Sequence, residues 1–412
     1  MLIDRLRIAV AIAGLAAGAG PAAAQTAAPA QPGQPQPVAG WNDGFFVQSA
    51  DGTTRLQLGT IVQTDGRFAL DDPLPITNTF VLRKARAVFG GRITRFVEFK
   101  LMPEFAGSTT ILDAYFDIRF TSQFRVRSGK DKTPIGYELL VADGSLVLPE
   151  RSVASQLVPN RDVGFQVLGE LAGGRVAYQG GVFNGNPADA TSSTTDSDVN
   201  SAKDLAGRVV FLPFKLVTGS PLANLGFHLG ASTGTQSGAL PSYRTSIGQT
   251  FFAYATGTAA DGARTRITPA VFLYTGKFGG FAEYVRSSAD LLRGAVRTTA
   301  ANQAWNATAT YLLTADTTSE RGVRPHAPFD PTTGQWGAVQ AVVRYGELTV
   351  DDDVFAAGLA AANASRRTRQ LTLGTNWYVN NFVKVYGSYE RYWFDGGNAT
   401  ENSILFRTQL AF

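Results

Sequence analysis

The chain is dominated by short segments in which apolar and polar residues alternate one by one. The segment 112–118 is typical: its even-numbered positions are Leu, Ala, Phe and Ile, and its odd-numbered positions are Asp, Tyr and Asp. A period of two places the apolar side chains on one face of a β-strand. About seventeen such segments follow one another between Thr53 and Phe412, which predicts an all-β chain.

Two architectures satisfy this pattern. A soluble sandwich or β-solenoid would bury the apolar face in a core, whereas a transmembrane barrel would turn it to lipid and its polar face to a water-filled lumen. The polar faces carry Arg, Lys, Glu and Asp at successive positions, which favours the barrel. A secreted β-rich binding or structural protein is the alternative.

The connections between segments also favour a barrel. Short turns are expected at Gly90-Gly91, Gly173-Gly174, Gly279-Gly280 and Asn380-Asn381, and long polar loops at 184–201, 288–303, 314–335 and 347–368. Outer-membrane barrels have short turns at one end and long loops at the other. Such single-chain barrels usually have an even strand number, so we expect sixteen strands, with eighteen as the fallback.

The two ends of the chain predict export to the outer membrane of a Gram-negative bacterium. Residues 1–24 have a basic start, an apolar core and an A-x-A ending, as in a secretory signal peptide. Residues 25–40 form a Pro-, Ala- and Gln-rich linker, and the barrel is expected over 41–412. The last segment closes on Phe412 and resembles the recognition signal of outer-membrane barrels, which predicts the barrel-assembly machinery and outer-membrane lipid as partners.

One stretch interrupts the alternation. The residues from Asp131 to Asn160 contain no regular period but many apolar side chains, among them Ile135, Tyr137 and Leu139. A long connection of this kind is usually functional or disordered, and its apolar content argues against disorder. We therefore expect an inward-folded constriction loop over about 131–160.

Positive charge is concentrated beside this loop. Residues 83–132 contain eleven Lys and Arg against five Asp and Glu, a net +6, whereas the whole chain carries +4. Fixed cations in a water-filled pore concentrate anions, and the planar fork of arginine suits phosphate. The competing interpretation is that these cations merely pair with Glu98, Asp113 and Asp117. The predicted anion-binding or pore-lining residues are Lys84, Arg86, Lys100, Arg119, Arg125, Arg127, Lys130, Lys132 and Arg151.

Several motifs in this region resemble the phosphate-selective porin O/P family of Gram-negative outer membranes. They begin at Phe80 (FVLRKAR), Leu112 (LDAYF), Lys130 (KDKTPIGYE), Pro149 (PERS), Pro159 (PNRDVGFQ) and Tyr178 (YQGGVFNG). The resemblance implies a sixteen-stranded homotrimeric porin whose third loop folds inward. It also implies passive diffusion of small anions, inorganic phosphate or polyphosphate among them, with a general porin lacking phosphate preference as the alternative.

No enzyme, cofactor or nucleic-acid partner is expected. The motif Gly230-Ala-Ser-Thr-Gly234 has the spacing of a nucleophile elbow, but no helical period follows it. With two His and no Cys, a transition-metal site is not expected. The run Asp351-Asp-Asp353 has the chemistry to bind a hard cation such as calcium, but a solvated external loop is the favoured interpretation.

Overall fold

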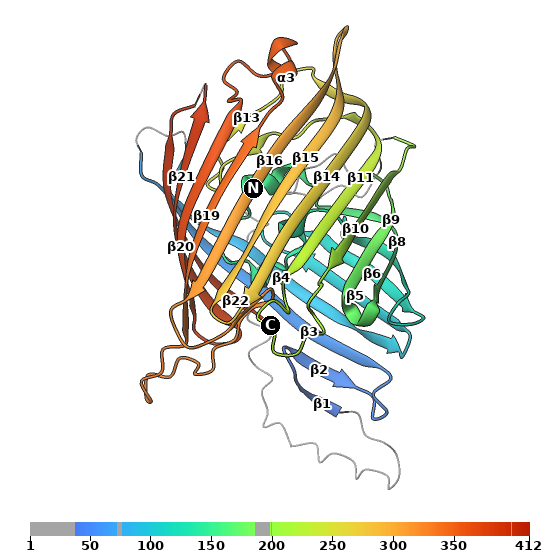
Figure 1. Ribbon diagram of the computed structural model, residues 1–412, viewed down its shortest axis with the longest axis vertical. Coiled ribbons are helices and arrows are strands. Elements are labelled where there is room, and N and C mark those ends of the chain that lie inside the picture. Colours follow the sequence, from blue (N-terminus) through green and yellow to red (C-terminus); the bar gives the residue numbers. More distant parts are fainter. Residues whose placement is uncertain (1–37, 72–75, 186–197, 199, 397) are drawn as a thin grey trace, which may run out of the picture.

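The protein is a closed antiparallel β-barrel (Figure 1). The computed structural model describes residues 38–71, 76–185, 198, 200–396 and 398–412. The predicted signal peptide, and the predicted linker up to residue 37, lie outside the described residues. None of the helices in the described part is long and apolar enough to cross a membrane.

In the described chain the main sheet has eighteen strands; two of them lie outside the ring, which leaves sixteen in the barrel. The barrel strands are β3 (Arg55–Ala69), β4 (Thr79–Thr94), β5 (Val97–Glu104), β6 (Thr110–Arg119), β7 (Arg125–Lys132), β8 (Arg161–Leu171), β9 (Val176–Phe183), β10 (Asp204–Phe211), β11 (Gly226–Gly238), β14 (Ala259–Thr275), β15 (Phe278–Arg293), β16 (Val296–Leu312), β19 (Ala338–Thr349), β20 (Arg367–Tyr378), β21 (Val383–Asp395) and β22 (Glu401–Ala411). β22 pairs with β3 from Ser403↔Ala69 to Ala411↔Ile61 and closes the ring. The predicted all-β barrel of sixteen strands is confirmed.

Side chains alternate between the inside and the outside of the barrel. On β22, the inward positions 401, 403, 405, 407 and 409 are buried, while Ile404, Phe406 and Leu410 on the outer face are exposed. Full closure pairs every strand edge, as a membrane requires. The exposed apolar outer face and the polar inner face exclude the sandwich and the solenoid.

Two short strands lie outside the ring at the end with most of the short turns. β1 (Val38–Trp41) and β2 (Phe45–Gln48) form a hairpin, and β2 pairs with β3 from Arg55 to Leu58. The pairing of β22 with β3 ends at Ile61, and β2 pairs with the part of the same β3 edge that β22 does not reach. The ring of Trp41 lies 5.0 Å from that of Phe412.

The connections differ from the sequence prediction in three ways. Gly90-Gly91 lies inside β4, and Gly279-Gly280 lies inside β15. A Cβ at Gly91 would approach the carbonyl oxygen of Arg55 to 2.0 Å, so this glycine permits close strand contact rather than a turn. The range 288–303 is the extended β15–β16 hairpin (Figure 1), in which β16 continues beyond its neighbour β19 while β14 accompanies β15 as far as Leu292.

The third difference concerns residues 313–337, which join β16 to β19. They are long as predicted but lie at the short-turn end, where they carry the β17 (Thr318–Ser319) and β18 (Gly322–Val323) hairpin. At the other end, residues 239–258 carry β12 (Tyr243–Arg244) and β13 (Thr250–Phe252), and residues 350–366 carry α3 (Asp352–Ala356). The turn between β8 and β9 is η3 (Ala172–Gly174), as expected from its two glycines.

Residues 133–160, between β7 and β8, form the inner loop. It contains α2 (Tyr137–Leu140), η1 (Asp143–Ser145) and η2 (Val153–Leu157). Ile135, Leu139 and Leu148 are buried, and η2 packs against the inner faces of β15, β16 and β19. The apolar residues that break the alternation therefore form a small core between the loop and the barrel wall.

Candidate functional site

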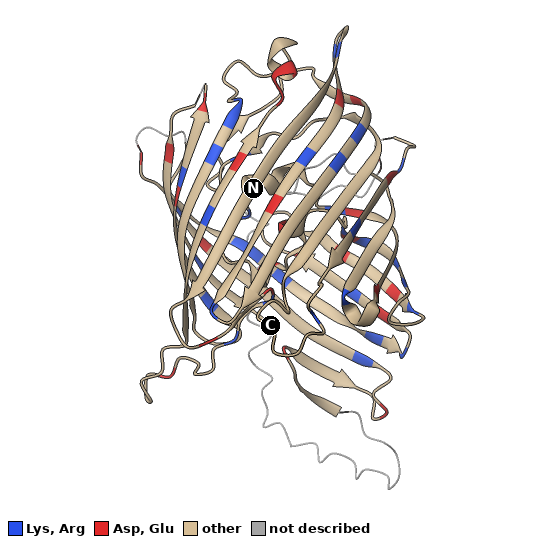
Figure 2. Ribbon diagram, in the orientation of Figure 1, with Lys and Arg blue, Asp and Glu red and all other residues tan. Residues whose placement is uncertain are grey.

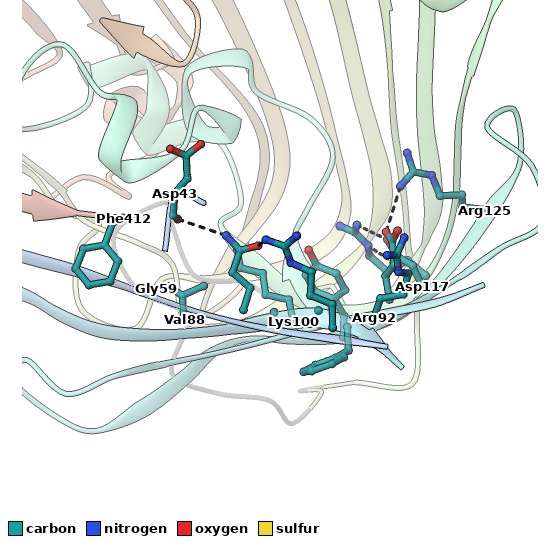
Figure 3. A pocket seen from close by; sticks show the side chains of 16 residues that line it. Asp43, Gly59, Val88, Arg92, Lys100, Asp117, Arg125 and Phe412 are labelled. Carbon is teal, nitrogen blue, oxygen red and sulfur yellow. Dashed lines mark hydrogen bonds and ion pairs between the residues drawn. The ribbon is translucent and has the colours of Figure 1, made fainter. Parts of the chain in front are cut away.

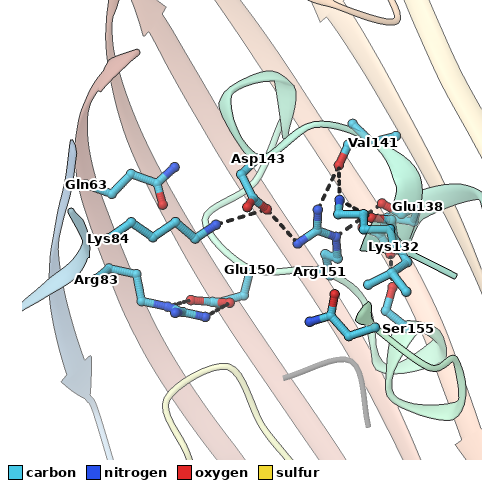
Figure 4. Close-up of polar contacts among 12 residues, drawn as sticks. Gln63, Arg83, Lys84, Lys132, Glu138, Val141, Asp143, Glu150, Arg151 and Ser155 are labelled. Carbon is cyan, nitrogen blue, oxygen red and sulfur yellow. Dashed lines mark hydrogen bonds and ion pairs between the residues drawn. The ribbon is translucent and has the colours of Figure 1, made fainter. Parts of the chain in front are cut away.

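The inner loop is attached to the wall through its acidic residues. The carboxylate of Asp143 lies 3.0 Å from Nζ of Lys84 on β4 and 2.9 Å from Nη1 of Arg151 on the loop itself (Figure 4). Arg86, also on β4, donates a third charged contact to Asp143. Burial alone would raise the pKa of Asp143, but these cations lower that pKa well below its ordinary value.

Glu150 makes the second attachment. Its carboxylate accepts from Arg67 on β3 at 3.0 Å, from Arg83 on β4 at 2.8 Å and from Arg407 on β22 at 3.1 Å. Burial opposes ionisation, yet the surrounding guanidinium groups, Arg83 foremost, lower the pKa of Glu150. This carboxylate therefore joins the loop to the seam where the barrel closes.

Glu138 makes the third attachment, on the opposite wall. It accepts from the backbone N–H of Ser152 at 3.0 Å and forms an ion pair with Arg344 of β19. The backbone N–H groups of Tyr137 and Glu138 in turn donate to Glu283 of β15, at 2.6 and 3.1 Å. The loop thus spans the lumen between two walls.

Two lysine side chains donate hydrogen bonds to backbone carbonyl groups of the inner loop. Lys132 donates to the carbonyl oxygens of Leu139 and Val141, at 2.5 and 3.1 Å. Lys384 of β21 donates to that of Leu146 at 2.8 Å. These ammonium groups satisfy carbonyls that the irregular backbone leaves unpaired, so their first role is to hold the loop in place.

A hollow of about 570 Å³ lies at the short-turn end of the lumen (Figure 3). Its cationic lining residues are Arg55, Arg92, Lys100, Arg125 and Arg127, and its acidic ones are Asp43, Glu98 and Asp117. These side chains come from the ends of β3 to β7 that meet the short turns, and from the segment between β1 and β2. Figure 2 shows how charged residues are distributed over the strands.

The cations of the hollow differ in how far they are neutralised. Arg127 contacts Asp117 at 2.7 Å and also pairs with Asp131. By contrast, one carboxylate, that of Glu98, lies 3.4 Å from Arg119 and 3.8 Å from Arg125. Glu98 is also the cross-strand neighbour of Arg92, which pairs in turn with Arg55. Among the described residues, three arginines (Arg92, Arg119 and Arg125) thus neighbour Glu98, and Arg55 lies one strand further away.

The predicted pore-lining residues separate into two groups. Those at the inner loop are Lys84, Arg86, Lys132 and Arg151. Those at or beside the hollow are Lys100, Arg119, Arg125 and Arg127. Lys130, near the end of β7, is 4% exposed. The ion pairs of the competing interpretation are also observed. Lys100 pairs with Asp113, Arg127 with Asp117 and Arg119 with Glu98.

Sequence reasoning missed several of the loop's partners. Strict alternation would turn Arg83 outward, but a register shift between β3 and β4 skips this residue, so that both Arg83 and Lys84 reach the loop. Bulges of this kind re-aim side chains. Arg407 was detectable, because it lies on the polar face of the last strand. Arg344 and Lys384 also lie at inward positions of their strands. Nothing in the sequence around them indicates that they bind a loop 194 or more residues away.

Comparison with known proteins places this geometry in a family. The model of the family described as phosphate-selective porin O and P matches residues 57–391. No curated protein matches the chain.

Solved structures of the same fold include three outer-membrane channels. The channel DcaP of Acinetobacter baumannii has 12% identity and a TM-score of 0.58, covering 87% of this chain and 98% of its own. The anion-selective porin of Comamonas acidovorans has 13% identity and a TM-score of 0.52, covering 87% and 99%. The trimer form of OmpT from Vibrio cholerae has 12% identity and a TM-score of 0.51, covering 87% and 100%. At these identities the likeness shows the fold.

Proposed function

The chain belongs to the phosphate-selective porin O and P family and is a porin of the Gram-negative outer membrane, and we propose that it admits small anions by passive diffusion. A channel function, rather than an enzymatic one, agrees with the family. It also agrees with the position of Ser232 in the elbow-like motif, because this serine lies inside β11 and not on a strand-to-helix turn. The proposed route passes the inner loop and the hollow at the short-turn end.

The observation that carries this proposal is the group of weakly compensated arginines at and beside the hollow. Arg119 and Arg125 share the single carboxylate of Glu98, and Arg55 and Arg92 form no ion pair among the described residues, while the neighbouring Arg127 is neutralised by two carboxylates. A water-filled cavity with walls of low dielectric constant focuses the field of such uncompensated charge and raises the local anion concentration. The hollow would therefore attract anions and repel cations.

A preference for phosphate is the finer proposal. The family description names it, and guanidinium groups bind phosphate oxygens through paired hydrogen bonds. One observation favours a general anion porin as the second candidate: the cations nearest the inner loop are already engaged by Asp143 and Glu150. Phosphate would then have to bind in the hollow rather than beside the loop.

Assembly is proposed by analogy and from the terminal strand. A homotrimer is proposed because the similar OmpT is described in a trimer form. Phe412 follows the outward face of β22 and is proposed to be read by the barrel-assembly machinery while the barrel inserts into lipid.

Planar bilayers test anion selectivity. Under a KCl gradient, the wild-type reversal potential should have the sign of a chloride-preferring pore. Arg125→Glu should move it toward zero or beyond, because it reverses a weakly compensated charge. The control is Arg297→Glu, which makes the same charge change at a side chain 65% exposed beyond the hollow. Cation selectivity of the wild type would refute the proposal.

Phosphate preference needs a separate measurement. Added phosphate should reduce the chloride current of the wild type in a saturable way, and Arg92→Gln should weaken this block. Sulfate at equal ionic strength controls for simple screening. Equal block by both anions would favour the general anion porin over the phosphate-preferring one.

A further inference from the structure

Two glutamates lie inside the barrel at the end opposite the hollow. Glu390 is on β21 and Glu401 begins β22, and both have 0% exposure. Glu390 pairs across the strands with Ser403, two positions along β22 from Glu401, so the two carboxylates are diagonal neighbours on one inward face. Diagonal neighbours are within reach of each other when their side chains are long.

Among the described residues, these glutamates form no ion pair with Arg or Lys, unlike most other buried carboxylates. Asp65, Glu104, Asp113, Asp117, Glu138, Asp143 and Asp204 each form an ion pair with Arg or Lys. Glu283 is compensated by two backbone N–H donors. In the described chain, Glu390 is bonded by the hydroxyl of Tyr392 at 3.2 Å and by the side chain of Ser246, and Glu401 by the hydroxyl of Thr245 at 2.8 Å. Hydroxyl donors alone leave two buried carboxylates far from neutralised when both are ionised.

The oxygens around them are also incompletely bonded. Oε1 of Glu390 and Oε1 of Glu401 have no hydrogen-bond partner among the described residues. The same holds for Oγ of Ser403, which is fully buried and stands opposite Glu390 on the face it shares with Glu401. Ser403 is therefore an unpartnered buried ligand atom that adjoins both carboxylates.

A segment of the 239–258 connection covers this cluster. Thr245 donates to Glu401, and its hydroxyl accepts from the backbone N–H of Gln249 at 3.1 Å. The side chain of Gln249 is 8% exposed, and its Oε1 has no partner in the part of the chain that the structure describes. Carboxylate, hydroxyl and amide oxygens thus come from the wall and from the connection that folds over it.

We propose that Glu390, Glu401 and Ser403, with Thr245 and Gln249, form a site for a hard divalent cation, of which Ca²⁺ is the example. Ca²⁺ accepts six to eight oxygen ligands in flexible geometry, including carboxylates, neutral oxygens and water. One divalent ion cancels the charge of both glutamates. The site has two carboxylates, and no group of three or more His, Cys, Asp or Glu suited to a metal occurs among the described residues.

The cation would tie the connection to the wall at the mouth of the barrel. Thr245 and Gln249 belong to the connection, whereas Glu390, Glu401 and Ser403 belong to adjacent barrel strands. Removal of the cation would leave the two buried carboxylates to repel each other beneath residues 245–249. Loss of the ion should therefore loosen this connection while the closed ring of strands persists.

Terbium luminescence tests the site directly, because Tb³⁺ replaces Ca²⁺ and is sensitised by a nearby tyrosine. The hydroxyl of Tyr392 is bonded to Glu390. Detergent-purified, chelator-treated protein should show saturable Tb³⁺ emission that Ca²⁺ displaces. Glu390→Gln with Glu401→Gln should weaken binding about tenfold or more, as loss of metal-site groups does. The matched control is Asp352→Asn with Asp353→Asn, which removes two carboxylates from the exposed α3.

Thermal unfolding separates cation binding from a merely structural role. Ca²⁺ should raise the melting temperature of the wild type but not that of the double glutamine variant. In chelator the variant should be at least as stable as the wild type, because the amides remove two uncompensated charges. Emission and Ca²⁺ stabilisation that are equal in the variant and the wild type would overturn the proposal. So would a wild type whose stability follows pH but not Ca²⁺, since the glutamates would then be neutralised by protons.

Discussion

The guanidinium of Arg407, on the last strand of the barrel, donates to both carboxylate oxygens of Asp65, on the first, at 2.6 and 2.7 Å. Both side chains are 1% exposed. Arg407 also reaches Glu150 at 3.1 Å and the carbonyl oxygen of Pro149. A single side chain therefore links the closure of the barrel to the position of the inner loop.

Arg407→Ala should destabilise the folded barrel strongly. It leaves the buried Asp65 without its bidentate partner, and breaking a buried pair by removing one member costs about 3–5 kcal/mol. Urea unfolding in lipid vesicles, followed by tryptophan fluorescence, measures the loss. For comparison, Arg367→Ala removes an arginine that is 32% exposed and lies 3.4 Å from Glu347 and 3.8 Å from Asp395, surface pairs worth about 0–1 kcal/mol each. Equal losses for the two variants would show that the seam pair is not special.

The alternation of residues was enough to predict the fold because it is a local property. The polar face of β22, with Glu401, Ser403 and Arg407, and the outer face that ends in Phe412 can both be derived from residue order alone. Each strand has one face toward the lumen and one toward the outside. Closure of the barrel therefore leaves few ways to pair the strands with one another.

Contacts between distant segments could not be predicted in the same way. The register shift that turns Arg83 inward depends on how β3 and β4 pair, and no residue near it marks the shift. The long connection 313–337 lies at the short-turn end, which its length and polarity alone do not reveal. The cluster at Glu390 and Glu401 was also missed, because Thr245, which covers it, lies 156 positions before Glu401 in the chain.

Asp143→Asn should increase anion selectivity. The carboxylate neutralises Lys84, Arg86 and Arg151, so its loss releases positive charge beside the inner loop. Reversal potentials under a KCl gradient should shift toward the chloride value. Asp351→Asn, the same charge change at the cap of α3, serves as the control and should leave selectivity unchanged. A shift of the same size in the control would assign the effect to net charge instead.

Acid should weaken the attachment of the inner loop in a defined range. The pKa of Asp143 is depressed by Lys84 and Arg151 against the effect of burial, so it lies below the unfolded value of about 3.9. The ionised carboxylate thus stabilises the fold above about pH 4, and this contribution is lost as the pH falls through the folded-state pKa. The stability difference between wild type and Asp143→Asn should be constant from about pH 5 to 7 and shrink below about pH 4. A difference that already declines near neutral pH would contradict the assigned direction.

Deletion of residues 38–48 should leave a closed barrel with lower thermal stability. The hairpin of β1 and β2 lies outside the ring, whose seam runs from Ser403↔Ala69 to Ala411↔Ile61. Without it, β3 loses its pairing over 55–58, and Phe412 loses the ring of Trp41. Heat-modifiable migration should persist, with the transition at a lower temperature.

The double variant Trp41→Ala with Phe45→Ala separates the two contributions of the hairpin. It keeps the backbone pairing of β2 with β3 but removes the two rings that lie 5.0 and 6.2 Å from the ring of Phe412. An intermediate melting temperature is expected, because aromatic pairs contribute about 0.5–1.5 kcal/mol beyond burial. If the deletion abolishes the heat-modifiable form altogether, the hairpin is needed for closure, and the sixteen-strand seam alone does not explain how the barrel is sealed.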